Sequence, residues 1–220
     1  MYKELFDEKH RIIKFTTHTP NSQRAIFSNE YEDNILCKKC DNKIIGKLES
    51  YAAQLFYKIP PKYKNFKKPD GLEFTQFYNL DYKKFKLFLL SLLWRASISS
   101  RDFFKNVSLG PYGDKIRMMI LSDDPGPSNS YPCIITSYRR IHLPKELVAE
   151  PRKFIFSGSD KRGYAFLIGG FLYNFKIVEN DDTDWVLEAT INEKGEMKIL
   201  HTTKELAKKL LNSYFGIKLF

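Results

Sequence analysis

Cysteine is scarce in this sequence, and its scarcity limits what the chain can build. The 220 residues include three cysteines: Cys37 and Cys40 form a Cys-x-x-Cys pair, and Cys133 stands alone. Without a second Cys-x-x-Cys, a four-cysteine zinc site within one chain and a disulfide-rich secreted scaffold are both excluded. Charged residues rather than an apolar run follow Met1, so we expect no signal peptide and a location in the reducing cytoplasm.

Long apolar runs are also absent. The longest, FKLFLLSLLW at 85–94, is too short to cross a bilayer, and it has lysines before it and Arg95 after it. The sequence therefore predicts neither a membrane-spanning helix nor a membrane partner. At 43% hydrophobic and 15% aromatic residues, the chain nevertheless has ample material for a buried core.

Acidic residues are outnumbered, with 26 Asp and Glu against 36 Lys and Arg, which gives a net charge of +10. The surplus is concentrated in residues 51–100, which carry nine basic against three acidic residues. A local basic surplus suits an anionic partner such as nucleic acid. The alternative is a set of solvated lysines without a partner.

Hydrophobic periodicity predicts helices in the first part of the chain and strands in the second. The helix over 80–96 is apolar nearly all round and is expected to be central and buried. Three prolines and a Pro-Asp-Gly turn predict a loop over 57–71. The other expected helices are 48–57, 99–107, 112–123 and 203–215, and the expected strands are 133–138, 153–158, 164–178, 184–191 and 197–203.

This order of elements predicts an α+β fold. Residues 1–122 are expected to form a helical half that carries a remnant Cys-x-x-Cys knuckle. It would pack on an antiparallel β half, residues 123–220, that ends in a helix, and the two halves would form one integrated unit. Gly169-Gly170 predicts a bend or bulge in the longest strand run, and Thr202 with Glu205 predicts a capping box for the last helix.

Cys37 and Cys40 raise the question of zinc. Two thiolates spaced Cys-x-x-Cys reach one tetrahedral ion from a tight turn, but a closed structural site needs two further ligands. His10 and His18 are the nearby candidates, and both precede the cysteines. The alternatives are two reduced cysteines left from a lost site, or a redox pair.

The surroundings of this pair resemble a bacterial family related to HNH nucleases, whose members carry a treble-clef zinc knuckle. The segment YEDNILCKKCDNKIIGKLESYA matches its Leu-Cys-x-x-Cys-acid knuckle and the Glu and aromatic that follow. The matching residues are Leu36, Cys37, Cys40, Asp41, Glu49 and Tyr51. The helix DYKKFKLFLLSLLWRASIS is similar to the next helix of that family, with its pattern at Leu92, Trp94 and Arg95.

The resemblance implies a nuclease ancestry, but the sequence departs from the family's pattern. The family's first Cys-x-x-Cys and the Ser-His-Ile segment that supplies the histidine are both absent. An HNH nuclease needs a histidine to activate water beside its metal. The resemblance therefore implies a degenerate, non-catalytic member that binds nucleic acid, or an active metal-dependent nuclease whose missing half-site lies upstream or in a partner. A third hypothesis is a protein-interaction module that uses the last helix or a sheet edge.

Basic and aromatic residues interleave in the segment 57–71. Lysines neutralise phosphates and aromatic faces stack on bases, so this segment is the candidate nucleic-acid site. Its alternative role is a solvated loop whose aromatics anchor it to the core. The candidate residues are Lys58, Lys62, Lys64, Lys67, Lys68, Tyr63 and Phe66. Trp94 and Arg95 are expected to be a buried structural anchor, with Glu49 as the partner of the arginine.

Overall fold

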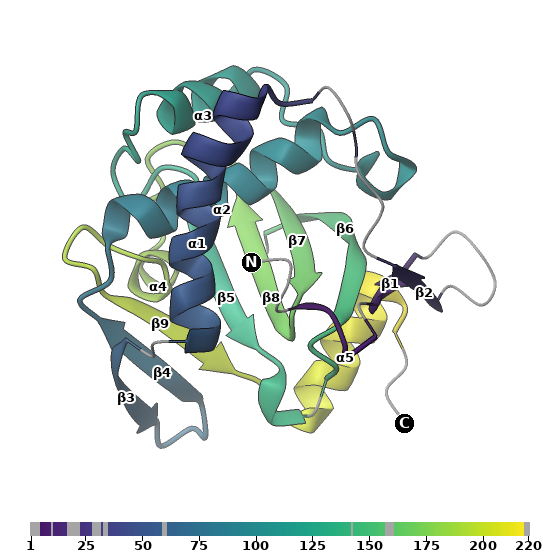
Figure 1. Ribbon diagram of the computed structural model, residues 1–220. Coiled ribbons are helices and arrows are strands. Elements are labelled where there is room, and N and C mark those ends of the chain that lie inside the picture. Colours follow the sequence, from purple (N-terminus) through teal and green to yellow (C-terminus); the bar gives the residue numbers. More distant parts are fainter. Residues whose placement is uncertain are drawn as a thin grey trace.

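The computed structural model in Figure 1 shows one mixed β-sheet with helices on both faces. In the described part of the chain the sheet has nine strands, and five α-helices accompany it. The protein is therefore a mixed α/β protein, as the sequence predicts in outline. The described residues are 5–9, 11–16, 23–27, 32, 35–58, 61–141, 143–156 and 161–217.

The sheet runs in the order β2-β1-β6-β7-β8-β5-β9-β4-β3. The pairs β1–β6 and β5–β9 are parallel and the other neighbours antiparallel. The strands are β1 (Arg11–Phe15), β2 (Gln23–Phe27), β3 (Lys62–Lys67), β4 (Glu73–Tyr78), β5 (Cys133–Ser137), β6 (Leu147–Ile155), β7 (Arg162–Ile168), β8 (Phe171–Lys176) and β9 (Met197–His201).

This topology corrects the expected arrangement of a helical first half on a purely antiparallel second half. Strands from the first half of the chain form both edges of the sheet, and strands from the second half fill its centre. The helices are α1 (Gly46–Ala53), α2 (Tyr82–Ile98), α3 (Tyr112–Leu121), α4 (Asp184–Ala189) and α5 (Lys204–Phe215). Two π-helical turns, Cys40–Ile45 and Gln54–Lys58, extend α1 at its two ends.

Side chains of the central strands point alternately to the two faces of the sheet, and apolar residues on both sides form a core on each face. In β7, Tyr164 and Phe166 belong to the core under α1, α2 and α3, whereas Ala165 and Leu167 belong to the core under α5. Successive side chains of a strand point to opposite faces, so a strand buried on both faces is apolar throughout. Figure 1 shows α1 and α2 lying across the first of these faces.

Helix α2 confirms the prediction of a central helix over 80–96. Asp81 caps it, since its Oδ1 accepts a hydrogen bond from the backbone N–H of Lys84 at 3.0 Å. Eleven of its residues are buried, and they include Lys86 and Ser91 as well as the apolar ones. The last helix, α5, also forms as predicted, although Thr203 rather than Thr202 caps it, with a hydrogen bond from Leu206 N–H at 3.2 Å.

Several segments differ from the sequence-based predictions. The expected loop 57–71 contains strand β3, and the expected strand 184–191 contains helix α4 instead. The expected helix 99–107 is reduced to the 3₁₀ turn Asp102–Phe104. Gly169 and Gly170, with φ of 65° and 77°, form the turn that splits the expected long strand into the hairpin β7–β8.

Lys86 gives the fold a distinctive pH dependence. Its amine is buried within α2 and donates to the Tyr82 hydroxyl at 3.2 Å and to the carbonyl of Pro127. Burial lowers the pKa of this amine to about 8, although Glu193 and Asp124 partly oppose the change. An unfolded lysine stays protonated up to its ordinary value of 10.5. Below pH 10.5, Lys86 is therefore charged in the unfolded chain. Folding must then either remove its proton or bury its charge.

We predict that the free energy of unfolding rises as the pH increases from about 8 towards 10, by on the order of 2 kcal/mol from this group. Lys86→Met should remove this rise, because the variant has no proton to lose. The measurement is urea unfolding at several pH values. Lys83→Met is the matched control on the same helix, since the Lys83 amine is partly exposed and pairs with Asp123. Equal pH profiles for wild type and Lys86→Met would contradict the prediction.

Candidate functional site

The candidate nucleic-acid segment is a β-hairpin at the edge of the sheet rather than a loop. Strand β3 pairs antiparallel with β4 from Lys62 opposite Tyr78 to Lys67 opposite Glu73. The predicted Pro-Asp-Gly turn joins the two strands. Gly71 there has a φ of 86°, a conformation that favours glycine, and its N–H donates to the Lys68 carbonyl at 2.9 Å.

All six residues of β3 are exposed. Lys62, Lys64 and Phe66 alternate with Tyr63, Asn65 and Lys67, so the two sets lie on opposite faces of the hairpin. On the first face, the ring of Phe66 stacks on that of Phe74, with centroids 5.0 Å apart and planes 12° from parallel. The amine of Lys198 lies 5.7 Å from the Phe74 ring centre. This set of lysines and stacked rings is called the hairpin face below.

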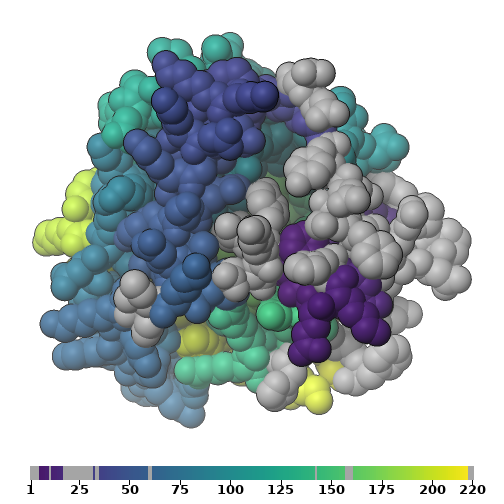
Figure 2. Space-filling model, viewed as in Figure 1, coloured from purple at the N-terminus to yellow at the C-terminus, as the bar shows by residue number. Residues whose placement is uncertain are grey.

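The lysines of the hairpin differ in their partners. Lys67 pairs with Glu73 at 3.1 Å, so its charge is partly neutralised within the protein. Within the described residues, neither Lys62 nor Lys64 has a carboxylate partner, and the same holds for Lys58 at the end of the π-helical turn. In Figure 2 this part of the chain forms the lower left border of the molecule. The unpaired positive charge therefore lies on the hairpin face and beside it.

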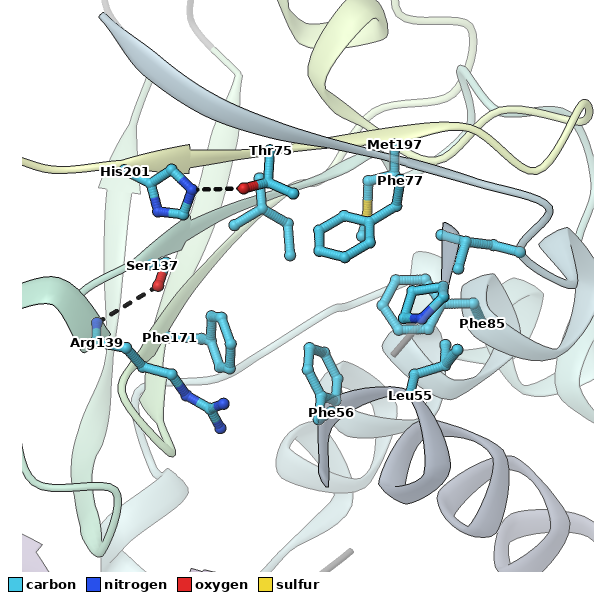
Figure 3. Close-up of a pocket in the computed structure, with 13 residues that line it drawn as sticks. Leu55, Phe56, Thr75, Phe77, Phe85, Ser137, Arg139, Phe171, Met197 and His201 are labelled. Atoms are coloured by element: carbon cyan, nitrogen blue, oxygen red, sulfur yellow. Dashed lines mark hydrogen bonds between the residues drawn. The ribbon is translucent and has the colours of Figure 1, made fainter. Parts of the chain in front are cut away.

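The opposite face of the hairpin borders a cavity of about 190 Å³. The cavity lies between the sheet, the π-helical turn after α1, and the start of α2. Its apolar wall includes Phe56, Phe77, Phe85, Phe171 and Met197. Figure 3 shows a polar end formed by His201, Ser137 and Arg139.

Strand register brings this polar end together. Glu73 is paired with His201, His201 with Ser137, and Ser137 with Phe171, so these four residues form one row across β4, β9, β5 and β8. Thr75 lies in the next row on the same face. Its hydroxyl donates to Asn65 Oδ1 at 2.6 Å and lies 2.7 Å from His201 Nε2.

His201 is held in this row by its contact with Thr75. Burial, followed by the charge of Arg140, lowers the pKa of the imidazole below its usual value. The other ring nitrogen, Nδ1, is buried and has no hydrogen-bond partner among the described residues.

Arg139 is held by aromatic rings rather than by a carboxylate. Its guanidinium carbon lies 4.4 Å from the ring centre of Phe171 and 5.2 Å from that of Tyr57. Its Nε donates to the carbonyl of Gly169 at 3.4 Å. The neighbouring Arg140, by contrast, pairs with Glu73. Arg139 thus brings a positive charge without a carboxylate partner to the polar end of a mainly apolar cavity.

Cys37 and Cys40 lie at the start of the long helix that contains α1. The N–H of Cys40 donates to Cys37 Sγ at 3.3 Å, and this hydrogen bond lowers the pKa of the exposed Cys37 thiol. The hydrogen bond with Cys37 raises the pKa of Cys40. A stabilised thiolate suits either a metal ligand or a redox thiol. Cys133, in contrast, is fully buried, and burial raises its pKa.

The remaining ligands of a zinc site are not found in the described part of the chain. No group of three or more His, Cys, Asp or Glu side chains gathers among those residues. The two histidines expected to complete the site, His10 and His18, lie outside them. The zinc site with Cys37, Cys40, His10 and His18 therefore stays a prediction.

The structure places the three residues of the expected anchor together. Glu49 of α1 and Arg95 of α2 form an ion pair at 2.8 Å, with side chains that are 17% and 18% exposed. Trp94 is buried in the core and lines a second cavity with Cys37 and Cys40. The ion pair ties α1 to α2.

Comparisons with known proteins do not assign the chain to a family. No family model, curated protein or solved structure matches it. The resemblance to HNH-related nucleases therefore stays a prediction based on the residues around Cys37 and in α2. In the described part of the chain, no helix combines the length and apolar character needed to cross a membrane.

Sequence reasoning missed the cavity and its polar end. Ser137, Arg139, Phe171 and His201 are spread over 65 positions of the chain and meet only through strand pairing. The one available signal was the pair Arg139-Arg140 at the end of a strand, which indicates a basic surface. It does not indicate that one arginine pairs with Glu73 while the other lines a cavity.

Proposed function

We propose that the protein binds nucleic acid through the hairpin face, without a catalytic role. The observation that carries the proposal is strand β3, a fully exposed edge strand that presents lysines beside a stacked pair of aromatic rings. Lys62 and Lys64 stand on this face, and Lys68 follows in the turn. Such a surface offers charges to phosphates and a ring face to an unstacked base.

The aromatic residues favour nucleic acid over a purely protective role for the lysines. Lysines on an edge strand also prevent sheets from pairing edge to edge. That role gives no reason for Phe66, which is 40% exposed on the same face and adds apolar surface to the edge. Stacking on single-stranded bases is a role that uses Phe66 and the lysines together. The proposal therefore favours single-stranded over double-stranded nucleic acid.

We predict that Lys62→Gln/Lys64→Gln/Lys68→Gln weakens binding of labelled single-stranded DNA or RNA about tenfold or more at moderate salt. The slope of log affinity against log salt should fall by roughly one unit per lysine that contacts a phosphate. Fluorescence anisotropy at several salt concentrations measures both. Phe66→Leu should weaken binding to single strands more than to a duplex of the same length, because only single strands expose base faces.

The matched control is Lys204→Gln/Lys208→Gln/Lys209→Gln on α5. These lysines are exposed too, so the control removes the same charge from a different element. Equal weakening by the two triple variants would show that net charge alone drives binding and would refute the hairpin face. Absence of binding by the wild type at low salt would refute the function itself. Metal-dependent cleavage of the labelled strand would support the nuclease alternative instead.

A further inference from the structure

The cavity beside the hairpin has the size of a small ring compound. An engineered cavity of about 150 Å³ in another protein stays dry and takes up benzene. The present cavity, at about 190 Å³, has room for one aromatic ring and a short substituent. Phe56, Phe77 and Phe171 supply ring faces and edges along its wall, and a flat apolar body packs well against such surfaces.

The charge in the cavity defines one end of the ligand. Arg139 is a permanent cation, and no carboxylate of the described residues pairs with it. Figure 3 shows Arg139 and Ser137 on one side of Phe171, with Phe77, Phe85 and Leu55 on the other. A ligand that fits this polarity has an anionic group at the arginine and an apolar ring pointing towards Phe77. The planar fork of a guanidinium matches a carboxylate in particular.

We propose that this cavity binds a small aromatic carboxylic acid, with its carboxylate on Arg139 and its ring among Phe56, Phe77 and Phe171. The proposal is independent of nucleic-acid binding, because the cavity and the hairpin face lie on opposite sides of β3 and β4. The full-length protein can therefore fail one test and pass the other.

The test is a titration of the full-length protein with 4-fluorobenzoate, followed by ¹⁹F NMR. We expect saturable binding that weakens about tenfold or more in Arg139→Gln and is partly restored in Arg139→Lys. Arg140→Gln is the matched control, since this neighbouring arginine pairs with Glu73 and does not line the cavity. Thermal unfolding of each variant confirms that it is folded. The neutral isostere 4-fluorobenzamide should bind at least tenfold more weakly than the acid to the wild type.

Three results would overturn the proposal. The first is no saturable binding of 4-fluorobenzoate at millimolar concentrations. The second is equal binding of the acid and the amide, or equal loss in the Arg139 and Arg140 variants, since the cavity cation would then play no part. The third is tighter binding of 4-fluorophenyl phosphate than of the acid, which would assign the cavity to phosphate esters instead. Selective loss in Arg139→Gln with retained binding in Arg140→Gln supports the assignment.

Discussion

Replacing Asp181 with alanine should lower the free energy of unfolding by about 3–5 kcal/mol. Asp181 and Lys176 form an ion pair at 2.7 Å, and their side chains are only 1% and 6% exposed. The Lys176 amine also donates to Thr183 Oγ1 at 2.9 Å, and the N–H of Thr183 donates to Asp181 Oδ1 at 2.9 Å. Removal of the carboxylate would leave a buried ammonium group without its counter-charge and a partly buried N–H without its acceptor.

The control for this prediction removes both charges at once. Lys176→Met/Asp181→Asn keeps an oxygen acceptor for the Thr183 N–H and leaves no unpaired charge. It should therefore cost much less than Asp181→Ala, because neutral replacements of a buried pair are often tolerated. Urea unfolding of both variants at neutral pH measures the difference. Equal destabilisation by the two variants would show that the unpaired charge of Lys176 is not the cause of the lower stability of Asp181→Ala.

Asp181 also contributes to unfolding in acid. Burial opposes its charge, but the hydrogen bonds from Lys176 and Thr183 outweigh burial and lower its pKa below the ordinary value of 3.8. The contribution is therefore fully present above the unfolded pKa and is lost as the pH falls through the lower folded pKa. The double variant should lack this part of the acid transition.

Helices α2 and α5 were predictable because their signals are local. In α2, the capping residue Asp81 comes directly before an apolar run. In α5, a capping residue precedes the helical segment and Gly216 follows it. The residues that determine where each helix begins and ends therefore lie within a few turns of one another. Gly216, with a φ of 66°, ends α5 in the left-handed conformation that favours glycine. The hairpin β7–β8 was half predictable: the apolar run was evident, but two consecutive glycines were interpreted as a bend instead of a hairpin turn.

Strand β3 was missed because its stability comes from a partner. Its sequence KYKNFK is polar and follows two prolines, so no buried face marks it as a strand. Backbone pairing with β4 and ring contacts such as Phe66 with Phe74 supply what the local sequence lacks. Helix α4 is the opposite case. Trp185 and Val186 suggest a strand, but α4 packs Val186 and Ala189 against Phe156, and tertiary packing outweighs local preference.

The candidate sites were also predictable only where their residues are close together in the sequence. The lysines and aromatics of 57–71 were identifiable because they are adjacent in sequence, although their division between two faces required the register of β3. The cavity could not be predicted, because its polar residues meet only when β5 pairs in parallel with β9. Parallel pairing between distant strands leaves no local signal in a sequence.

Replacing Gly195 with alanine should lower the free energy of unfolding by about 3 kcal/mol or more. Gly195 has a φ of 73°, and a Cβ atom there would lie 2.2 Å from the carbonyl oxygen of Leu80 and 2.9 Å from its nitrogen. Both contacts are with backbone, which cannot rotate away. The N–H of Leu80 also donates to the Gly195 carbonyl at 3.0 Å, so the clash would break a hydrogen bond as well.

The Gly71→Ala variant separates the free-energy cost of the left-handed conformation from that of the steric clash. Gly71 has a similar φ of 86°, but nothing lies within 4 Å of the position of its missing Cβ. Its replacement should therefore cost only the strain of the left-handed conformation, about 1–2 kcal/mol. Denaturant unfolding of both variants gives the difference, which reports the close approach of Gly195 to Leu80. A Gly195→Ala variant no less stable than Gly71→Ala would contradict this interpretation.

The contact between Gly195 and Leu80 also bears on the cavity. Leu80 lines the cavity at the junction of β4 and α2, and Gly195 comes two residues before Met197, which lines it from β9. The hydrogen bond between them fixes the start of α2 against the start of β9. A Gly195→Ala protein that still folds should therefore bind 4-fluorobenzoate more weakly, whereas Gly71→Ala, at the tip of the hairpin, should bind it as the wild type does.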